Sequence, residues 1–158
     1  MIDTTYACKM IRNYPDSLVL GGDIRYRELL NGYDSCVLEI IDALFYDYRR
    51  TGEEKYIMMI DSISKYSDGY ISEFLEENIG KLFSKSPINL IKYLSRKKEE
   101  DKIFQRTIWY LQSLHDYEYY ENEKEDVART IDSCLKILSK HDATWLKKIV
   151  RRAKLNTK

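Results

Sequence analysis

The chain has 158 residues, of which 44% are hydrophobic and 33% are charged, and its formal net charge at pH 7 is zero. This length suits one domain with its own core, and this composition excludes a disordered chain. Six Gly and two Pro leave little material for β-hairpins, barrels or glycine-rich phosphate-binding loops. The sequence also lacks a stretch of the roughly 20 apolar residues that a membrane-spanning helix needs. These limits favour an all-α protein.

The charges are distributed unevenly along the chain. Residues 1–80 hold 8 basic and 15 acidic side chains, a net charge of −7, whereas residues 81–158 hold 18 and 11, a net charge of +7. Such an asymmetry can steer a charged partner or favour head-to-tail self-association. A solvated surface without a role has the same pattern, so charge alone identifies no partner.

The three cysteines, Cys8, Cys36 and Cys134, form no C-x-x-C pair. An odd number of widely spaced cysteines fits neither a disulfide framework nor a zinc site, so we expect no metal and no cofactor. The first residues lack a basic stretch followed by an apolar one, as a signal peptide would have. We therefore expect a cytoplasmic protein, or a periplasmic or secreted one if a signal peptide has been removed.

The clearest helix is predicted over residues 34–51. Arg49 and Arg50 suit the negative C-terminal end of this helix, and Gly52 suits the left-handed residue that closes it. Its apolar residues recur at spacings of three and four, which puts them on one face of a helix. These residues are Val37, Ile40, Ile41, Leu44, Phe45 and Tyr48.

Six more helices are expected after residue 51. Their predicted starts lie near residues 53, 69, 87, 102, 123 and 142. Ser86-Pro87 predicts a start because Ser caps a helix and Pro loses no hydrogen bond at the first helical position. Asp142 is predicted to cap the last helix, a basic one over residues 142–158. Residues 1–33 carry the weakest pattern.

The predicted starts indicate the architecture. Two helices with their turns occupy about 35 residues, a length found in HEAT and tetratricopeptide repeats, although the tetratricopeptide residue pattern is absent. We predict a single α-helical domain over residues 1–158. It would consist of about seven to nine short antiparallel helices, arranged as a helical-hairpin array or as an irregular bundle.

Catalytic motifs are absent from the sequence. The pairs His115-Asp116 and His141-Asp142 invite comparison with the helical HD phosphohydrolases, which need an earlier His and a later Asp as further metal ligands. No His precedes His115, and no Asp follows Asp142. Motifs of hydrolases, nucleotide-binding folds and zinc proteases do not occur either. We expect a non-enzymatic protein that takes no small-molecule substrate; an enzyme without a recognisable motif is an alternative.

The first candidate surface is a turn rich in tyrosine and carboxylate, which we call the Tyr-acid segment. Tyrosine is enriched where proteins bind one another, and carboxylates attract a basic partner. The segment predicts a protein-protein interaction module, such as an immunity-type inhibitor of a toxin or enzyme. A solvated turn without a role is the alternative. The segment consists of Asp116, Tyr117, Glu118, Tyr119, Tyr120 and Glu121.

The second candidate surface is the basic side of the last helix. Its cations would bind the phosphates of nucleic acid or of an anionic membrane, which is the alternative function. A terminal helix that docks on the domain, with cations favourably placed at its C-terminal end, has the same pattern. The candidate anion-binding residues are Lys147, Lys148, Arg151, Arg152 and Lys154.

Overall fold

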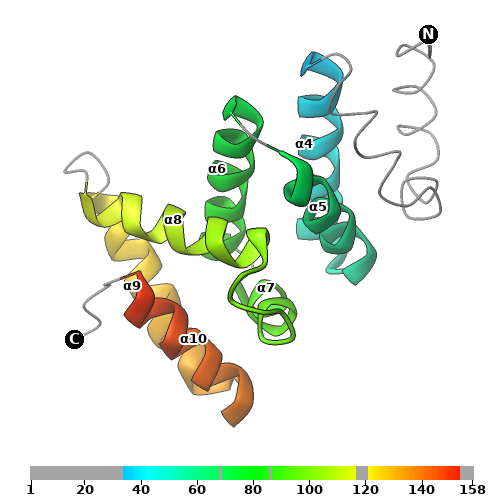
Figure 1. Ribbon diagram of the computed structural model, residues 1–158. Coiled ribbons are helices and arrows are strands. Elements are labelled where there is room, and N and C mark those ends of the chain that lie inside the picture. Colours follow the sequence, from blue (N-terminus) through cyan, green and yellow to red (C-terminus); the bar gives the residue numbers. More distant parts are fainter. Residues whose placement is uncertain (1–33, 68, 86, 117–120, 154–158) are drawn as a thin grey trace, which may run out of the picture. The chain divides into compact units, whose positions relative to one another are not determined.

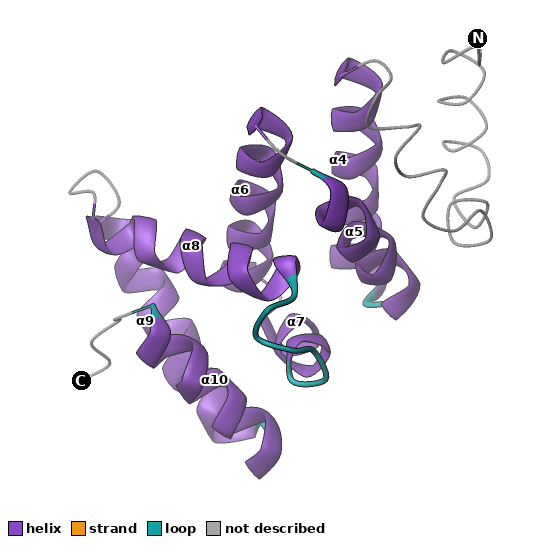
Figure 2. Ribbon diagram, in the orientation of Figure 1, coloured by secondary structure: helices purple, strands orange, loops and turns teal. Residues whose placement is uncertain are grey.

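The computed structural model describes residues 34–67, 69–85, 87–116 and 121–153. These residues form seven α-helices and no strand, which confirms the predicted all-α class (Figure 1, Figure 2). The chain divides into two compact units, residues 1–75 and residues 76–158. The single domain over residues 1–158 therefore stays a prediction.

In the first unit, α4 (Asp34–Thr51) and α5 (Glu54–Tyr66) pack side by side as a helical hairpin. All six apolar residues predicted for the inner face of α4 are buried. The helix ends at the predicted place because Gly52 adopts a φ of 69° and donates its N–H to the carbonyl of Tyr48, at 2.8 Å. Glycine adopts this left-handed conformation without steric cost.

The next helix, α6 (Gly69–Lys85), contributes residues 69–75 to the first unit and residues 76–85 to the second. It begins at the predicted residue. One stripe of apolar residues on this helix is buried, except that Phe74 is only partly buried. The buried members are Ile71, Leu75, Ile79, Leu82 and Phe83.

The second unit also contains α7 (Pro87–Leu94), α8 (Lys102–Asp116), α9 (Glu121–Ile137) and α10 (Lys140–Arg152). The last helix packs against α7, α8 and α9, and α7 also contacts α9. In a linear repeat array each repeat would contact only its neighbours. The second unit is therefore an irregular bundle, which is one of the two predicted arrangements.

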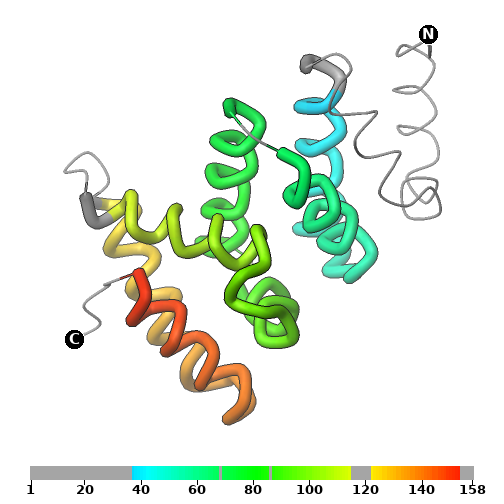
Figure 3. Tube along the Cα trace, viewed as in Figure 1, coloured from blue at the N-terminus to red at the C-terminus, as the bar shows by residue number. Residues whose placement is uncertain are grey.

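Two helix starts in the second unit test the capping predictions. Pro87 is the first residue of α7, as predicted. The prediction that Asp142 caps the last helix is wrong, because α10 begins two residues earlier and Ser139 is its N-cap. The Ser139 hydroxyl accepts the backbone N–H of Asp142, at 3.1 Å, so Asp142 lies in the first turn. The chain thus turns back from α9 into α10 within two residues (Figure 3).

One charged side chain lies inside the second unit. Arg106 of α8 is only 2% exposed, and its Nη1 lies 3.8 Å from Oε1 of Glu76 in α6. Burial lowers the pKa of the guanidinium, and the carboxylate of Glu76 partly offsets that change. Arginine stays protonated under such conditions, so α6 and α8 share an ion pair in which the guanidinium is buried and the carboxylate is partly exposed.

Candidate functional site

The Tyr-acid segment connects α8 to α9. Asp116 is the last residue of α8 and Glu121 the first of α9. Tyr117, Glu118, Tyr119 and Tyr120 lie outside the described residues. The segment thus joins, along the chain, two helices that both belong to the second unit.

The first turns of α9 continue the acidic character of the segment. Glu123, Glu125 and Asp126 are all exposed. Asp126 forms an ion pair with Arg129, one turn further along α9. The other two carboxylates have no ion-pair partner among the described residues. They therefore present negative charge to the solvent at the point where the segment ends.

Four of the five candidate anion-binding residues lie on α10. Lys147, Lys148, Arg151 and Arg152 are exposed on this helix, whereas Lys154 lies outside the described residues. The apolar side of the helix is buried in the unit through Leu146, Ile149, Val150 and Ala153. The helix is docked by one side and presents its cations on the other.

Glu99, in the turn between α7 and α8, neutralises part of this basic side. Its carboxylate forms ion pairs with Lys148 and with Arg152, the latter at 3.0 Å. The pKa of Glu99 is lowered, most by the hydrogen bond from Lys148; desolvation is the next largest effect and opposes it, and the charges of Arg152 and Lys148 add to the lowering. Lys147 and Arg151 have no ion-pair partner in the described part of the chain. The four cations thus form two pairs with different environments.

An open hollow lies beside the ion pairs of Glu99. Trp145 and Gln105 form part of its wall, and Arg152 lines it from α10. The turn between α7 and α8 supplies the remaining lining residues, which are Lys97, Lys98, Glu99 and Glu100. The Trp145 ring is held edge-on against Phe104, with ring centres 5.7 Å apart, and Lys148 Nζ lies 4.9 Å from the indole ring. The hollow therefore combines a fixed aromatic ring with mixed charges.

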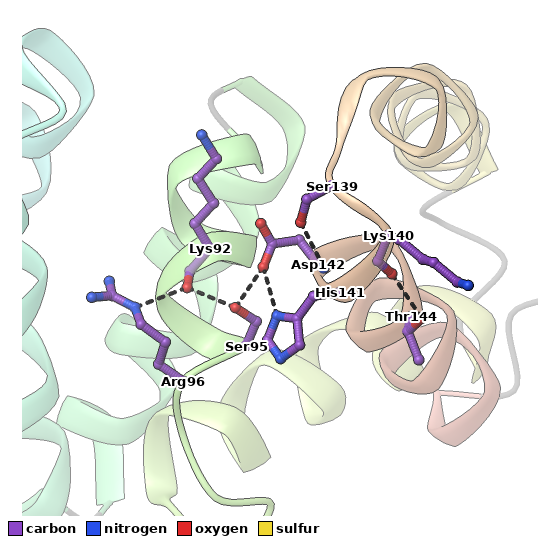
Figure 4. A network of polar contacts seen from close by, with 8 residues as sticks. All are labelled: Lys92, Ser95, Arg96, Ser139, Lys140, His141, Asp142 and Thr144. Carbon is purple, nitrogen blue, oxygen red and sulfur yellow. Dashed lines mark hydrogen bonds and ion pairs between the residues drawn. The ribbon is translucent and has the colours of Figure 1, made fainter.

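A polar network ties the end of α7 to the start of α10 (Figure 4). The Ser95 hydroxyl donates to Oδ1 of Asp142, at 2.7 Å. Nδ1 of His141 lies 3.2 Å from the same oxygen. The pKa of Asp142 is lowered, most by the bond from Ser95, with His141 and Ser139 acting in the same direction and desolvation opposing them.

This network contains the residue types of a hydrolase triad, but in a different order. In such a triad the histidine contacts both the serine and the carboxylate, so that it can take the proton of the serine. Here Asp142 is the central group, and Ser95 and His141 both contact it. The arrangement therefore joins two helices and does not activate the Ser95 hydroxyl as a nucleophile.

The described residues also provide neither a reactive thiol nor a cluster of metal ligands. Cys134 is buried, and burial raises the pKa of its thiol, so the reactive thiolate is disfavoured. Among the described residues, no group of three or more His, Cys, Asp or Glu side chains is placed to hold a metal ion. In that same part of the chain, no helix has the length and apolar character needed to cross a membrane.

Comparison of the chain with protein-family models, with curated proteins and with solved structures finds no match. Function is therefore inferred from the surfaces of the molecule alone.

Two features of these surfaces were not predicted from the sequence. The ion pairs of Glu99 join residues about 50 positions apart, and local spacing says nothing about such contacts. Trp109 of α8 is 49% exposed, although it lies in a helix with a strong apolar stripe. In the sequence Trp109 stands between Ile108 and Tyr110, as part of an apolar run. A helical projection places it outside the stripe formed by Phe104, Ile108 and Leu111, so its exposure could have been predicted.

Proposed function

We propose that this protein is a non-enzymatic binding module whose partner is another protein with a basic surface. The partner docks on the Tyr-acid segment and on the first turns of α9. An immunity-type inhibitor, which binds and silences a toxin or an enzyme, is the specific form that we propose.

The exposed carboxylates at the start of α9 carry this proposal. Negative charge at a helix N-terminus is favourable in itself, because it faces the positive end of the helix dipole. That effect does not account for the three tyrosines immediately before the helix, since tyrosine contributes large rigid contact area rather than charge. Acids that speed association, next to aromatic rings that bind tightly, suit a surface for a cationic protein.

Affinity capture from the native host tests this proposal. The immobilised protein is expected to enrich a protein with a basic surface, and a Glu123→Lys/Glu125→Lys variant is expected to capture much less of it. The matched control is Asp42→Lys/Glu73→Lys, which makes the same change in net charge at two exposed acids on α4 and α6. Failure to enrich any protein, or equal loss with both variants, contradicts the proposal.

A further inference from the structure

Both tryptophans of the chain lie on helices that border the hollow. Trp145 of α10 lines it and is fixed by its contact with Phe104. Trp109 lies on α8 with about half of its surface exposed. Planar aromatic rings are the groups on which nucleic-acid bases stack.

The hydrogen bonds of α8 locate Trp109 relative to the cations. Gln105 and Gln112 lie four residues before and three residues after Trp109, so the three share one side of the helix. Gln105 lines the hollow together with Arg152. Gln112 donates its side-chain amide to the backbone carbonyl of Arg152, at 3.3 Å. Trp109 therefore lies one turn from a residue that lines the hollow and one turn from a residue that bonds to the C-terminal end of α10.

Several cations lie on α10 and at the hollow. Arg152 lines the hollow, and Lys148, one turn before it on α10, shares with it the ion-pair partner Glu99. Lys147 precedes Lys148 by one residue, and Arg151 precedes Arg152 by one residue. Each is therefore rotated by about 100° around the axis of α10 from the residue that follows it. Lys98 adds an exposed cation to the lining of the hollow. A strand of phosphates that begins at Trp109 would thus meet Lys98 among the mixed charges of the hollow and the exposed cations of α10 beyond it.

The burial of α10 distinguishes between two polyanions. A helix that binds a membrane surface inserts its apolar side among the lipids. The apolar side of α10 is already buried in the second unit, with Leu146 and Ile149 fully inaccessible to solvent. The cations remain available for phosphates, but the apolar residues that would enter a bilayer do not.

We infer that this surface, the α8–α10 face (Lys98, Trp109, Lys147, Lys148, Arg151 and Arg152), binds single-stranded nucleic acid. One base stacks on Trp109, and the phosphates contact the cations of α10. This inference goes beyond the proposed function and uses different residues, so either can fail without the other.

Fluorescence anisotropy with a labelled oligo(dT) of about 12 nucleotides tests the inference. We expect saturable binding at about 50 mM salt, and three or four phosphate contacts predict a log–log salt slope between about −2 and −3. Lys147→Glu/Arg151→Glu is expected to weaken binding at least tenfold. The matched control, Lys85→Glu/Lys136→Glu, changes two exposed lysines on α6 and α9 and is expected to weaken it less than twofold.

Two more variants test how the strand is held. Trp109→Ala is expected to weaken binding to oligo(dT) at least fivefold, because a stacked base is lost. Glu99→Gln is expected to tighten binding, because it removes the carboxylate that neutralises Lys148 and Arg152. Far-UV circular dichroism checks that each variant is folded.

Four results would overturn the inference. They are no binding to oligo(dT) at low salt, equal weakening by the two charge-reversal pairs, an unchanged affinity of Trp109→Ala, and binding to vesicles of anionic lipid without binding to oligo(dT).

Discussion

Gly80 of α6 lies directly against the ring of Tyr110 of α8. A Cβ atom built on Gly80 would stand 2.6 Å from Cδ2 of Tyr110 and even nearer to Cε2 and Cζ. Glycine inside a helix costs about 0.5–1 kcal/mol relative to alanine, so a buried glycine in α6 needs a compensating reason. The close approach of the tyrosine ring is that reason, and it lets α6 and α8 pack closely within the second unit.

Substitution of Gly80 should therefore have the opposite effect to the usual one. At an unconstrained helical position, Gly→Ala would stabilise the protein. Here we expect Gly80→Ala to lower the free energy of unfolding by about 1–3 kcal/mol, because the methyl group overlaps the Tyr110 ring. Urea denaturation followed by circular dichroism measures this difference.

A double-mutant cycle identifies the cause of that loss. If the ring is responsible, Gly80→Ala should cost less in a Tyr110→Ala background than in the wild type. Equal costs in both backgrounds would show that Tyr110 is not the group that excludes a side chain at position 80.

The lowered pKa of Asp142 predicts a dependence of stability on pH. The pKa of Asp142 is lower in the folded protein than its ordinary value of 3.8. The carboxylate therefore stabilises the folded state fully at pH values above that ordinary value. This stabilisation is lost as the pH falls through the lower folded pKa. Asp142→Asn, which cannot titrate, should cost about 1 kcal/mol near neutral pH, and the difference from the wild type should narrow in acid.

Unfolding free energies measured from neutral pH down to about pH 3 test this expectation. The stability difference between Ser95→Ala and the wild type should also narrow in acid, although less than for Asp142→Asn. The reason is that the Ser95 hydroxyl is the largest cause of the lowered pKa of Asp142. A difference between Asp142→Asn and the wild type that stays constant with pH would contradict this account of the network.

The cap of α10 gives a second test near the same site. Ser139→Ala should lower the free energy of unfolding by about 0.5–2 kcal/mol, because the N–H of Asp142 loses its acceptor. Ser133→Ala, at an exposed position in α9, serves as the control and should change stability much less. Equal effects of the two substitutions would argue against Ser139 as the cap.

The ion pair between the buried Arg106 and Glu76 predicts a non-additive result. Glu76→Ala should destabilise the protein by about 1–3 kcal/mol, because the carboxylate that offsets a buried guanidinium is lost. The double variant Glu76→Ala/Arg106→Met removes the buried charge as well, so it should recover part of that loss. Thermal unfolding of both variants measures it, and a double variant that loses the sum of both single effects would contradict the role of the pair.

Much of the fold could be predicted because its signals are local. The stripe from Val37 to Tyr48 and the left-handed Gly52 are both set by neighbours within a few residues, and the structure confirms them. The start of α10 was mispredicted for a local reason too. Ser139 and Asp142 are both good capping residues three positions apart, and the sequence alone does not rank them.

The contacts between distant segments could not be predicted in this way. Ser95 bonds to Asp142 and Glu99 to Arg152 because the bundle brings the turn after α7 next to α10. No periodicity within either segment encodes that proximity. The basic residues of α10 were predicted as a group. Glu99 divides them into Lys148 and Arg152, which it neutralises, and the two cations that it does not contact. Local patterns do not connect Glu99 to this helix.

The most direct test of the proposed function is the affinity of the captured partner, once purified, for three forms of this protein. Replacement of Tyr117, Tyr119 and Tyr120 by Ala should weaken binding by at least tenfold, because hot-spot tyrosines each contribute more than about 1 kcal/mol. Tyr46→Ala removes an exposed tyrosine of α4 and should leave the affinity unchanged. Unchanged affinity of the triple variant, or equal weakening by Tyr46→Ala, would contradict docking on the Tyr-acid segment.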